Sequence, residues 1–379
     1  MRSKAAAAVA GAAPAPDNGA MSSRKYLVLG ALGLVGRAVL RALERRGDEV
    51  IAISRRQPDS SGTARFVSLD LTDRDACAAT FGRAEFADVS HVVYAALHEK
   101  PELIAGWRDP EQIRINTEML RNVLDFVEPL EHLALLQGTK AYGAHIAPMK
   151  LPGKETDPRH PGDNFYWTQE DLVRERSASG GWAFSVFRPQ VVCGDAVGSP
   201  MNLVAALGVY ASISRALGEP LRFPGGAGVL TEATDADLLA DAIVWTGGEP
   251  ACGGETLNVT NGDVLEWHGV WPTVARVFGM PAGEPTPRRL AVEMPRHGAL
   301  WDRLVADHGL RPWTMDQLIG SSWQFADAVF GFGAERNPGA VTLLSTIRIR
   351  QLGFHDCVDT ERMLERQLSN LQARRILPR

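Results

Sequence analysis

The sequence has no uninterrupted apolar stretch long enough to cross a bilayer, so a membrane-spanning protein is not expected. Cysteine is scarce, and Cys77, Cys193, Cys252 and Cys357 are far apart, which argues against a disulfide framework and against paired metal ligands. A reducing, cytoplasmic compartment is the simplest expectation. Basic residues are not in excess, because 40 Lys and Arg face 45 Asp and Glu, so a nucleic-acid partner is not expected either.

Histidines at metal-binding spacing are also missing. His98, His145 and His268 have no second ligand at a suitable interval, so no metal site is predicted. What remains is an ordinary globular composition, with 45% hydrophobic and 22% charged residues. A chain of 379 residues suits one large domain with a smaller lobe, as a monomer or a homodimer.

Residues 1–22 differ from the rest of the chain because they are rich in alanine and contain Pro14 and Pro16. We expect a disordered leader or a misassigned start, with Met21 as the alternative start. Arg2 and Lys4 precede a short Ala/Val run, which leaves a weak export signal open, although no leucine-rich core follows.

A glycine-rich turn organises the sequence that follows. Tyr26 to Leu29 predict a buried strand, glycines then recur at GxxGxxG spacing, and Val39, Leu40 and Leu43 recur at helical spacing. A strand, a glycine turn and a helix start form a cradle in which backbone N–H groups can approach a pyrophosphate. The expected nucleotide-binding residues of this turn are Gly30, Leu32, Gly33, Leu34 and Gly36.

The second predicted strand, 49–54, ends in Ser54, Arg55 and Arg56. In a dinucleotide-binding unit an acidic residue at this position binds the ribose 2′-hydroxyl of NAD, whereas arginine accommodates the 2′-phosphate of NADP. Two guanidinium groups and no acid therefore favour NADP(H). The alternative is a solvated loop in which the basic residues have no such role.

The ends of the next two predicted strands supply further cofactor contacts. Residues 65–69 are followed by Asp70 and Leu71, where the aspartate can either meet the adenine amino group or cap the next helix. Residues 91–96 end in Ala95 and Ala96, whose small side chains leave room for the cofactor.

Strands and helices alternate, which predicts an α/β fold with a doubly wound parallel sheet. Further strands are expected at 133–137, 182–187 and 255–259, and helices at about 111–127, 164–176, 202–217 and 235–244. We expect an NADP-binding domain over 23–200 with 229–260 returning to it. Residues 201–228 and 261–379 would form a mostly helical substrate lobe, whose part beyond Gly262 is rich in Trp and Phe.

The glycine turn, the Arg188–Pro189 turn and the strand order resemble the extended short-chain dehydrogenase/reductase superfamily. In its common form a Tyr-x-x-x-Lys pair transfers the proton, and the lysine lowers the pKa of the tyrosine. Here Tyr166 is followed four residues later by Glu170, whose negative charge would raise the pKa of a phenol. The departure speaks against an ordinary alcohol dehydrogenase.

Lys140, after the fifth predicted strand, offers a replacement. Together with Tyr166 it resembles one subfamily, the progesterone 5β-reductases and iridoid synthases, which are NADPH-dependent enone reductases. The resemblance covers essentially everything after the leader and rests on several segments taken together. These are 138–142, 164–171, 155–159, 199–203, 223–225, 322–327, 352–354 and 358–360.

The resemblance implies hydride transfer to the β-carbon of a small apolar enone or enal, with Tyr166 donating a hydrogen bond to the carbonyl oxygen. Lys140 would hold the nicotinamide ribose and keep the local field positive, and Val192 and Ser199 would line the cofactor site. Two rivals stay open: a carbonyl reductase or epimerase of the same superfamily, and a nucleotide-binding sensor without catalysis.

Overall fold

The strand before the glycine turn lies inside a seven-stranded, fully parallel sheet of order β11-β6-β5-β4-β1-β2-β3. The computed structural model describes residues 24–58, 62–127, 130–226, 230–332 and 341–379, so the expected leader at 1–22 lies outside the described residues. The strands of the sheet are β1 (Lys25–Leu29), β2 (Glu49–Ser54), β3 (Arg65–Ser68), β4 (His91–Tyr94), β5 (His132–Leu136), β6 (Ala183–Pro189) and β11 (Glu255–Val259). All seven predicted strands are confirmed, and the doubly wound α/β class with them.

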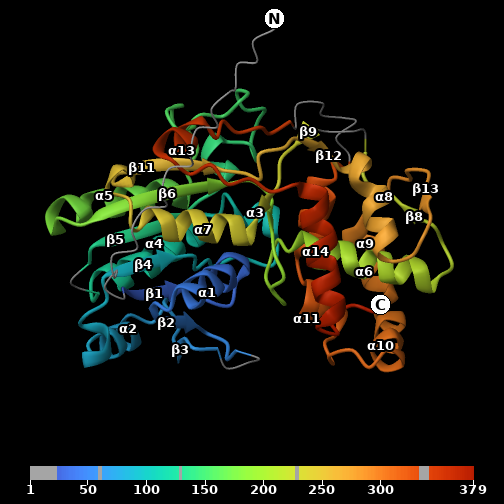
Figure 1. Cartoon of the computed structure of the whole chain (residues 1–379), viewed down its shortest axis with the longest axis horizontal. Coiled ribbons are helices and arrows are strands. Elements are labelled where there is room, and N and C mark those ends of the chain that lie inside the picture. Colours follow the sequence, from blue (N-terminus) through green and yellow to red (C-terminus); the bar gives the residue numbers. More distant parts are fainter. Residues whose placement is uncertain (1–23, 59–61, 128–129, 227–229, 333–340) are drawn as a thin grey trace, which may run out of the picture.

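Both faces of the sheet are covered by helices. Helices α1 (Leu34–Arg46) and α7 (Ala236–Thr246) cover one face, while α2 (Arg74–Phe81), α4 (Pro110–Leu124) and α5 (Phe165–Gly180) cover the other (Figure 1). Strand β1 contributes to the cores on both faces of the sheet. Tyr26 and Val28 pack in the core on the α1 side, and Leu27 and Leu29 pack in the core on the opposite side. Successive side chains of a strand point to opposite faces, so a strand buried on both sides is apolar throughout.

The caps of these helices follow from the sequence. Asn164 caps α5 by accepting a hydrogen bond from the Tyr166 backbone N–H at 3.0 Å, and Asp235 caps α7 by accepting one from Asp237. Helix α5 continues to Gly180, beyond the predicted end at residue 176, and stops where Gly181 takes a left-handed conformation. Helix α4 ends at Leu124, three residues before the predicted end at residue 127.

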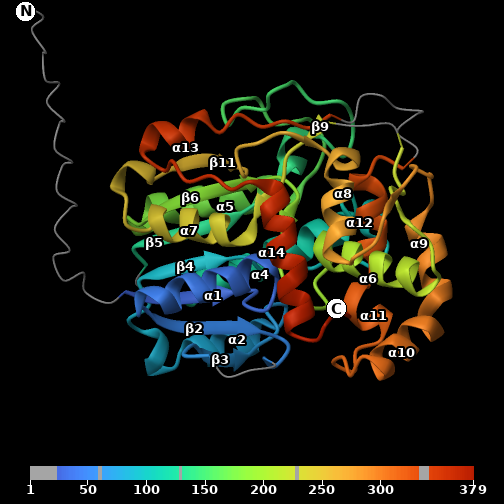
Figure 2. The ribbon, with the colours of Figure 1, turned by 45° about the vertical axis from the view of Figure 1, so that its right-hand side comes forward.

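A second hydrophobic core lies among the later helices. It contains Trp271, Trp301, Trp323 and Phe330, so these predicted lobe aromatics pack inside the core. Its helices are α6 (Leu203–Ala216), α8 (Trp267–Val277), α9 (Leu290–Glu293), α10 (Gly298–Asp307), α11 (Met315–Ile319), α12 (Ser322–Val329) and α14 (Thr360–Ala373). Figure 2 shows α14 between the sheet and the other lobe helices. The exact division into two domains stays a prediction.

Short elements complete the described chain. Three two-stranded pairs join distant segments: β7 (Val192–Cys193) with β10 (Thr234–Asp235), β8 (Leu221–Arg222) with β13 (Ala282–Gly283), and β9 (Leu230–Thr231) with β12 (Leu265–Glu266). The remaining helices are η1 (Ala84–Phe86), α3 (Leu103–Gly106), η2 (Thr139–Tyr142), η3 (Pro250–Cys252), η4 (Met294–His297) and α13 (Ile347–Leu352).

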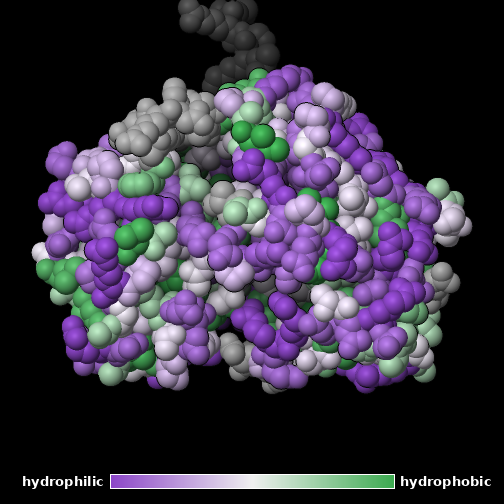
Figure 3. Space-filling view, turned by 180° about the vertical axis from the view of Figure 1, so that it is seen from behind, coloured by the Kyte–Doolittle hydropathy of each residue, from purple (hydrophilic) through white to green (hydrophobic). Residues whose placement is uncertain are grey.

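The face seen in Figure 3 is largely hydrophilic, and its apolar side chains occur singly or in small groups. None of the helices in the described ranges is long and apolar enough to span a membrane.

Candidate active site

The glycine turn joins β1 to α1 and brings the backbone close to the carboxyl end of β4. Gly30 has φ +78°, and a Cβ added there would stand 2.5 Å from the Ala95 carbonyl oxygen. A Cβ on Gly36 would collide with the Gly30 carbonyl, and Gly33 is the N-cap of α1. Only glycine fits at positions 30 and 36, which leaves the N-terminus of α1 open to an anion.

A cavity of about 720 Å³ runs along the carboxyl ends of the strands, in the place where doubly wound sheets bind nucleotides. Every predicted cofactor residue except Gly36, which supports the turn from within α1, lines this cavity. Those on the wall are Gly30, Leu32, Gly33, Leu34, Ser54, Arg55, Arg56, Asp70, Leu71, Ala95, Ala96, Lys140, Tyr166, Val192 and Ser199. The cavity and the glycine cradle therefore fit a dinucleotide.

At the predicted adenosine end, Arg55 and Arg56 follow β2 and are exposed. Arg56 Nη1 donates to the carbonyls of Val197 and Gly198 at 3.3 and 3.5 Å, so this side chain reaches across to the far wall of the cavity. The arginines border the site on the side where a 2′-phosphate would lie.

Asp70 does not cap a helix, so that interpretation of it is wrong, while its contact with adenine stays a prediction. Asp73 caps α2 instead, by accepting a hydrogen bond from the Ala76 N–H at 2.9 Å. Asp70 accepts from the Thr72 N–H and hydroxyl at 3.0 and 2.8 Å on the cavity wall. Burial alone would raise the pKa of Asp70, but these hydrogen bonds lower it below its ordinary value. A charged carboxylate is thus available to an adenine amino group.

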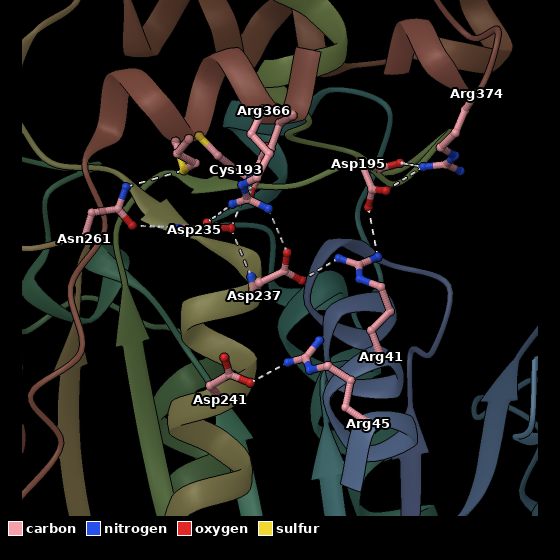
Figure 4. Close-up of polar contacts among 12 residues, drawn as sticks. Arg41, Arg45, Cys193, Asp195, Asp235, Asp237, Asp241, Asn261, Arg366 and Arg374 are labelled. Atoms are coloured by element: carbon pink, nitrogen blue, oxygen red, sulfur yellow. Dashed lines mark hydrogen bonds and ion pairs between the residues drawn. The ribbon is translucent and has the colours of Figure 1, made fainter. Parts of the chain in front are cut away.

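The segment after β7 belongs to a network of ion pairs that also links α1, α7 and α14 (Figure 4). Asp195 pairs with Arg41 of α1 at 3.1 Å and with Arg374, just after α14, at 2.6 Å. Arg41 also pairs with Asp237 of α7, which pairs in turn with Arg366 of α14. Gly198 and Ser199 line the cavity just beyond Asp195. The network therefore ties this wall of the site to the helices that cover the sheet and to α14.

Lys140 and Tyr166 meet on the same wall. Lys140 lies in η2 after β5 and Tyr166 in the first turn of α5; both are buried, and the Lys140 ammonium stands 5.6 Å from the centre of the Tyr166 ring. The Tyr166 hydroxyl lies 3.4 Å from the place of a Cβ on Gly138. Among the residues that the structure describes, none accepts a hydrogen bond from this hydroxyl. The phenol is therefore free to donate to a ligand in the cavity.

Glu170, which stands where the usual lysine is expected, is turned into a separate network. Its carboxylate accepts hydrogen bonds from Arg188 Nη2 at 3.3 Å, Arg174 Nη2 at 2.9 Å and Gln137 Nε2 at 3.1 Å. Burial would raise the pKa of Glu170, but these partners lower it, so the group is a compensated carboxylate.

The pKa of Tyr166 is raised well above its ordinary value, first by burial and then by Glu99, while Arg188 opposes the rise. The effect on the phenol pKa that we predicted for Glu170 comes from Glu99 instead, because Arg174 and Arg188 compensate the charge of Glu170. The spacing along the helix does not show these arginine contacts. The phenol stays protonated at neutral pH.

Sequence reasoning missed Glu99 and Trp107. Lys140 Nζ lies 3.8 Å from Glu99 Oε1 and 4.4 Å above the Trp107 ring. The expected positive field of Lys140 is therefore largely compensated by a neighbouring carboxylate. A signal was present, since Leu97, His98 and Glu99 directly follow a buried strand whose carboxyl end faces the site.

The histidines set aside earlier do not form a metal site. Within the described ranges, no group of three or more His, Cys, Asp or Glu side chains could hold a metal ion. His98 lines the cavity, and His145 packs edge-on against Trp107 with ring centres 6.1 Å apart. Burial, followed by the Lys140 charge, lowers the pKa of His145 to about 4.

Comparison with known proteins agrees with this geometry. Residues 26–259 match the NAD dependent epimerase/dehydratase family. The chain is 32% identical over 328 residues to an (S)-8-oxocitronellyl enol synthase of Nepeta racemosa, covering 80% of each chain. It is 28% identical over 378 residues to another from Camptotheca acuminata, covering 93% of each.

Solved structures show the same fold at lower identity. A UDP-glucose 4-epimerase from Thermotoga maritima aligns with a TM-score of 0.65 and 14% identity over 92% of this chain and 99% of that one. An epimerase from Methanothermobacter thermautotrophicus aligns with a TM-score of 0.67 and 17% identity over 93% of each chain.

Proposed function

The chain belongs to the NAD dependent epimerase/dehydratase family and, within the extended short-chain dehydrogenase/reductase superfamily, to the progesterone 5β-reductase and iridoid synthase family. From that premise we propose that it reduces α,β-unsaturated ketones or aldehydes at the carbon–carbon double bond with NADPH. Membership of this family makes the chain an oxidoreductase that uses a nicotinamide dinucleotide.

One observation carries the proposal. A phenol from α5 and an ammonium group from η2 reach the same wall of a cavity whose other end is built for a dinucleotide. A lysine from a turn near β5 takes the place of the missing helix lysine, so the reaction does not depend on the Tyr-x-x-x-Lys pair.

The chain's own residues have simple tasks in this reaction. When bound, the cofactor supplies the hydride that adds to the β-carbon of the enone. Negative charge then develops on the carbonyl oxygen, and the Tyr166 hydroxyl donates a hydrogen bond to it, which stabilises the enolate by several kcal/mol. Water gives a proton to the α-carbon, so that one hydride and one proton add across the double bond. Lys140 holds the nicotinamide ribose.

Two further features support the choice of cofactor and substrate. Arg55 and Arg56 can fork onto the 2′-phosphate of NADPH, and no acidic residue stands directly at the end of β2. Apolar side chains such as Val191, Met201 and Phe325 border the cavity and suit a small apolar enone or enal. The relatives' name refers to an enol, which is the protonated form of the enolate that hydride addition produces.

The proposal is tested by following NADPH oxidation with a panel of cyclic enones and linear enals and identifying the products. The saturated carbonyl compound is expected. An allylic alcohol would assign a carbonyl reductase, and NADPH binding without oxidation across the panel would assign a sensor.

A further inference from the structure

A buried ion pair stands beside the reacting groups of the proposed site. The side chains of Glu99 and Lys140 are 5% and 11% exposed, and Glu99 Oε1 lies 3.8 Å from Lys140 Nζ. Burying two charges is costly unless each compensates the other, and removing one partner leaves the other uncompensated.

Glu99 is held in a fixed orientation. Gln112, which is fully buried in α4, donates from Nε2 to Glu99 Oε2 at 2.8 Å. Gln112 Oε1 accepts a hydrogen bond from the Lys100 backbone N–H at 2.9 Å, which fixes the side-chain amide in turn. The other oxygen, Oε1, has no hydrogen-bond partner in the described part of the chain and faces Lys140. The carboxylate is thus aimed at the lysine from behind the cavity wall.

We propose that Glu99 is a positioning residue, which holds the Lys140 ammonium against Trp107 and compensates its charge so that Tyr166 acts as a neutral hydrogen-bond donor. The consequence for catalysis rests on the function proposed above. With its charge compensated, Lys140 does not turn the phenol into a phenolate, as the lysine of an ordinary alcohol dehydrogenase does. The site then suits enolate stabilisation and not the removal of a proton from an alcohol.

The other charged and titratable groups near the pair are few. Lys140 faces Glu99 from the β4 end, Tyr166 from α5 and His145 after η2, and Tyr166 also faces Arg188 of β6. Burial lowers the pKa of Lys140, and Glu99 opposes this. Burial raises the pKa of Glu99, and Lys140 opposes that in turn. Each charge therefore helps the other to persist in the wall.

The test measures NADPH affinity by quenching of protein fluorescence from about pH 6 to about pH 10. Glu99→Gln is compared with Glu102→Gln, the same substitution at an exposed position three residues along the chain. In Glu99→Gln the uncompensated ammonium loses its proton at lower pH, so affinity should fall by about tenfold or more at the alkaline end. The natural chain and Glu102→Gln should lose affinity only at a higher pH than Glu99→Gln does, because Glu99 opposes the lowering of the Lys140 pKa by burial, and Glu99→Asp should behave much like them.

A Glu99→Gln protein with the pH profile of the natural chain would overturn the proposal. Should Glu99→Gln not fold, adding Lys140→Met should restore folding, because the uncompensated charge is then gone. A double variant that also fails to fold would assign Glu99 a purely structural role. This binding test uses no enone, so its outcome is independent of whether enone reduction is found.

Discussion

Arg188 Nη2 lies 3.3 Å from Glu170 Oε2, and both side chains are 5% exposed. This pair explains how a carboxylate can occupy the position where a catalytic lysine is usual: the arginine at the end of β6 compensates it inside the fold. The position has become structural, and the ammonium group of the site comes from η2 instead.

Replacing Glu170 by lysine should therefore destabilise the protein and should not create an alcohol dehydrogenase. The new ammonium would face Arg188 and Arg174 in a buried setting, and breaking such a pair costs about 3–5 kcal/mol. Thermal unfolding would show a clearly lower Tm. Glu175→Lys, on the exposed side of α5, is the matched control and should unfold near the natural Tm. A Glu170→Lys protein as stable as this control would contradict the structural role.

Tyr166→Phe should lower kcat by about 100-fold or more while NADPH affinity changes little, because the lost hydrogen bond acts mainly in the transition state. Steady-state kinetics with a reactive enone measure the first quantity and fluorescence titration the second. Tyr210→Phe removes another buried phenol that donates at 2.8 Å to the Arg222 carbonyl in the lobe, and it should leave kcat unchanged. Equal turnover in the two variants would remove Tyr166 from the reaction.

Replacing Arg55 and Arg56 together by alanine should reduce the preference for NADPH over NADH. A charge-assisted hydrogen bond contributes about 1.5–3 kcal/mol, so the ratio of kcat/KM values should fall by about 10- to 100-fold. The KM for NADPH should rise, while the KM for NADH should stay almost unchanged. Arg65→Ala, an exposed arginine of β3, serves as the control. If the preference survives in the double variant, the 2′-phosphate is bound elsewhere.

Stability should fall between neutral pH and about pH 5 because of His132. Burial lowers its pKa to about 3, so the folded protein keeps it neutral while the unfolded chain takes up a proton below its ordinary pKa. The depressed pKa means that the contribution is present above about pH 6.5 and is lost as the pH falls, by about 2 kcal/mol at pH 5.

The free energy of unfolding, measured in urea at neutral pH and at about pH 5 for the natural chain and for His132→Gln, checks this expectation. The variant should show a smaller difference between them, whereas the exposed His308→Gln should behave like the natural chain. An undiminished difference in His132→Gln would show that other groups carry the acid sensitivity.

Most of the architecture was predictable because its causes are local. Alternating strands and helices, glycine at 30 and 36, and the caps at Asn164 and Asp235 each follow from a short segment. That the predicted cofactor residues would line one cavity was predictable for the same reason, since the carboxyl ends of parallel strands meet at one edge of the sheet.

The charge pairing inside the site could not be predicted. Which carboxylate faces Tyr166 depends on how α4, η2 and β6 pack: Gln112 orients Glu99 toward Lys140, while Arg188 takes up Glu170. The sequence offers both acids and does not show which arginine or lysine each one meets. Asp70 is a similar case, because two aspartates, Asp70 and Asp73, could each have capped α2.

The central claim is that hydride reaches the β-carbon of a conjugated carbonyl compound held by Tyr166. The most direct measurement uses NADPH deuterated at the transferred position, with cyclohexenone as substrate and mass spectrometry and NMR of the product. Deuterium at the β-carbon of the saturated ketone is the predicted result, and this product should form about 100-fold more slowly with Tyr166→Phe. Deuterium on the carbonyl carbon of an allylic alcohol would contradict the account.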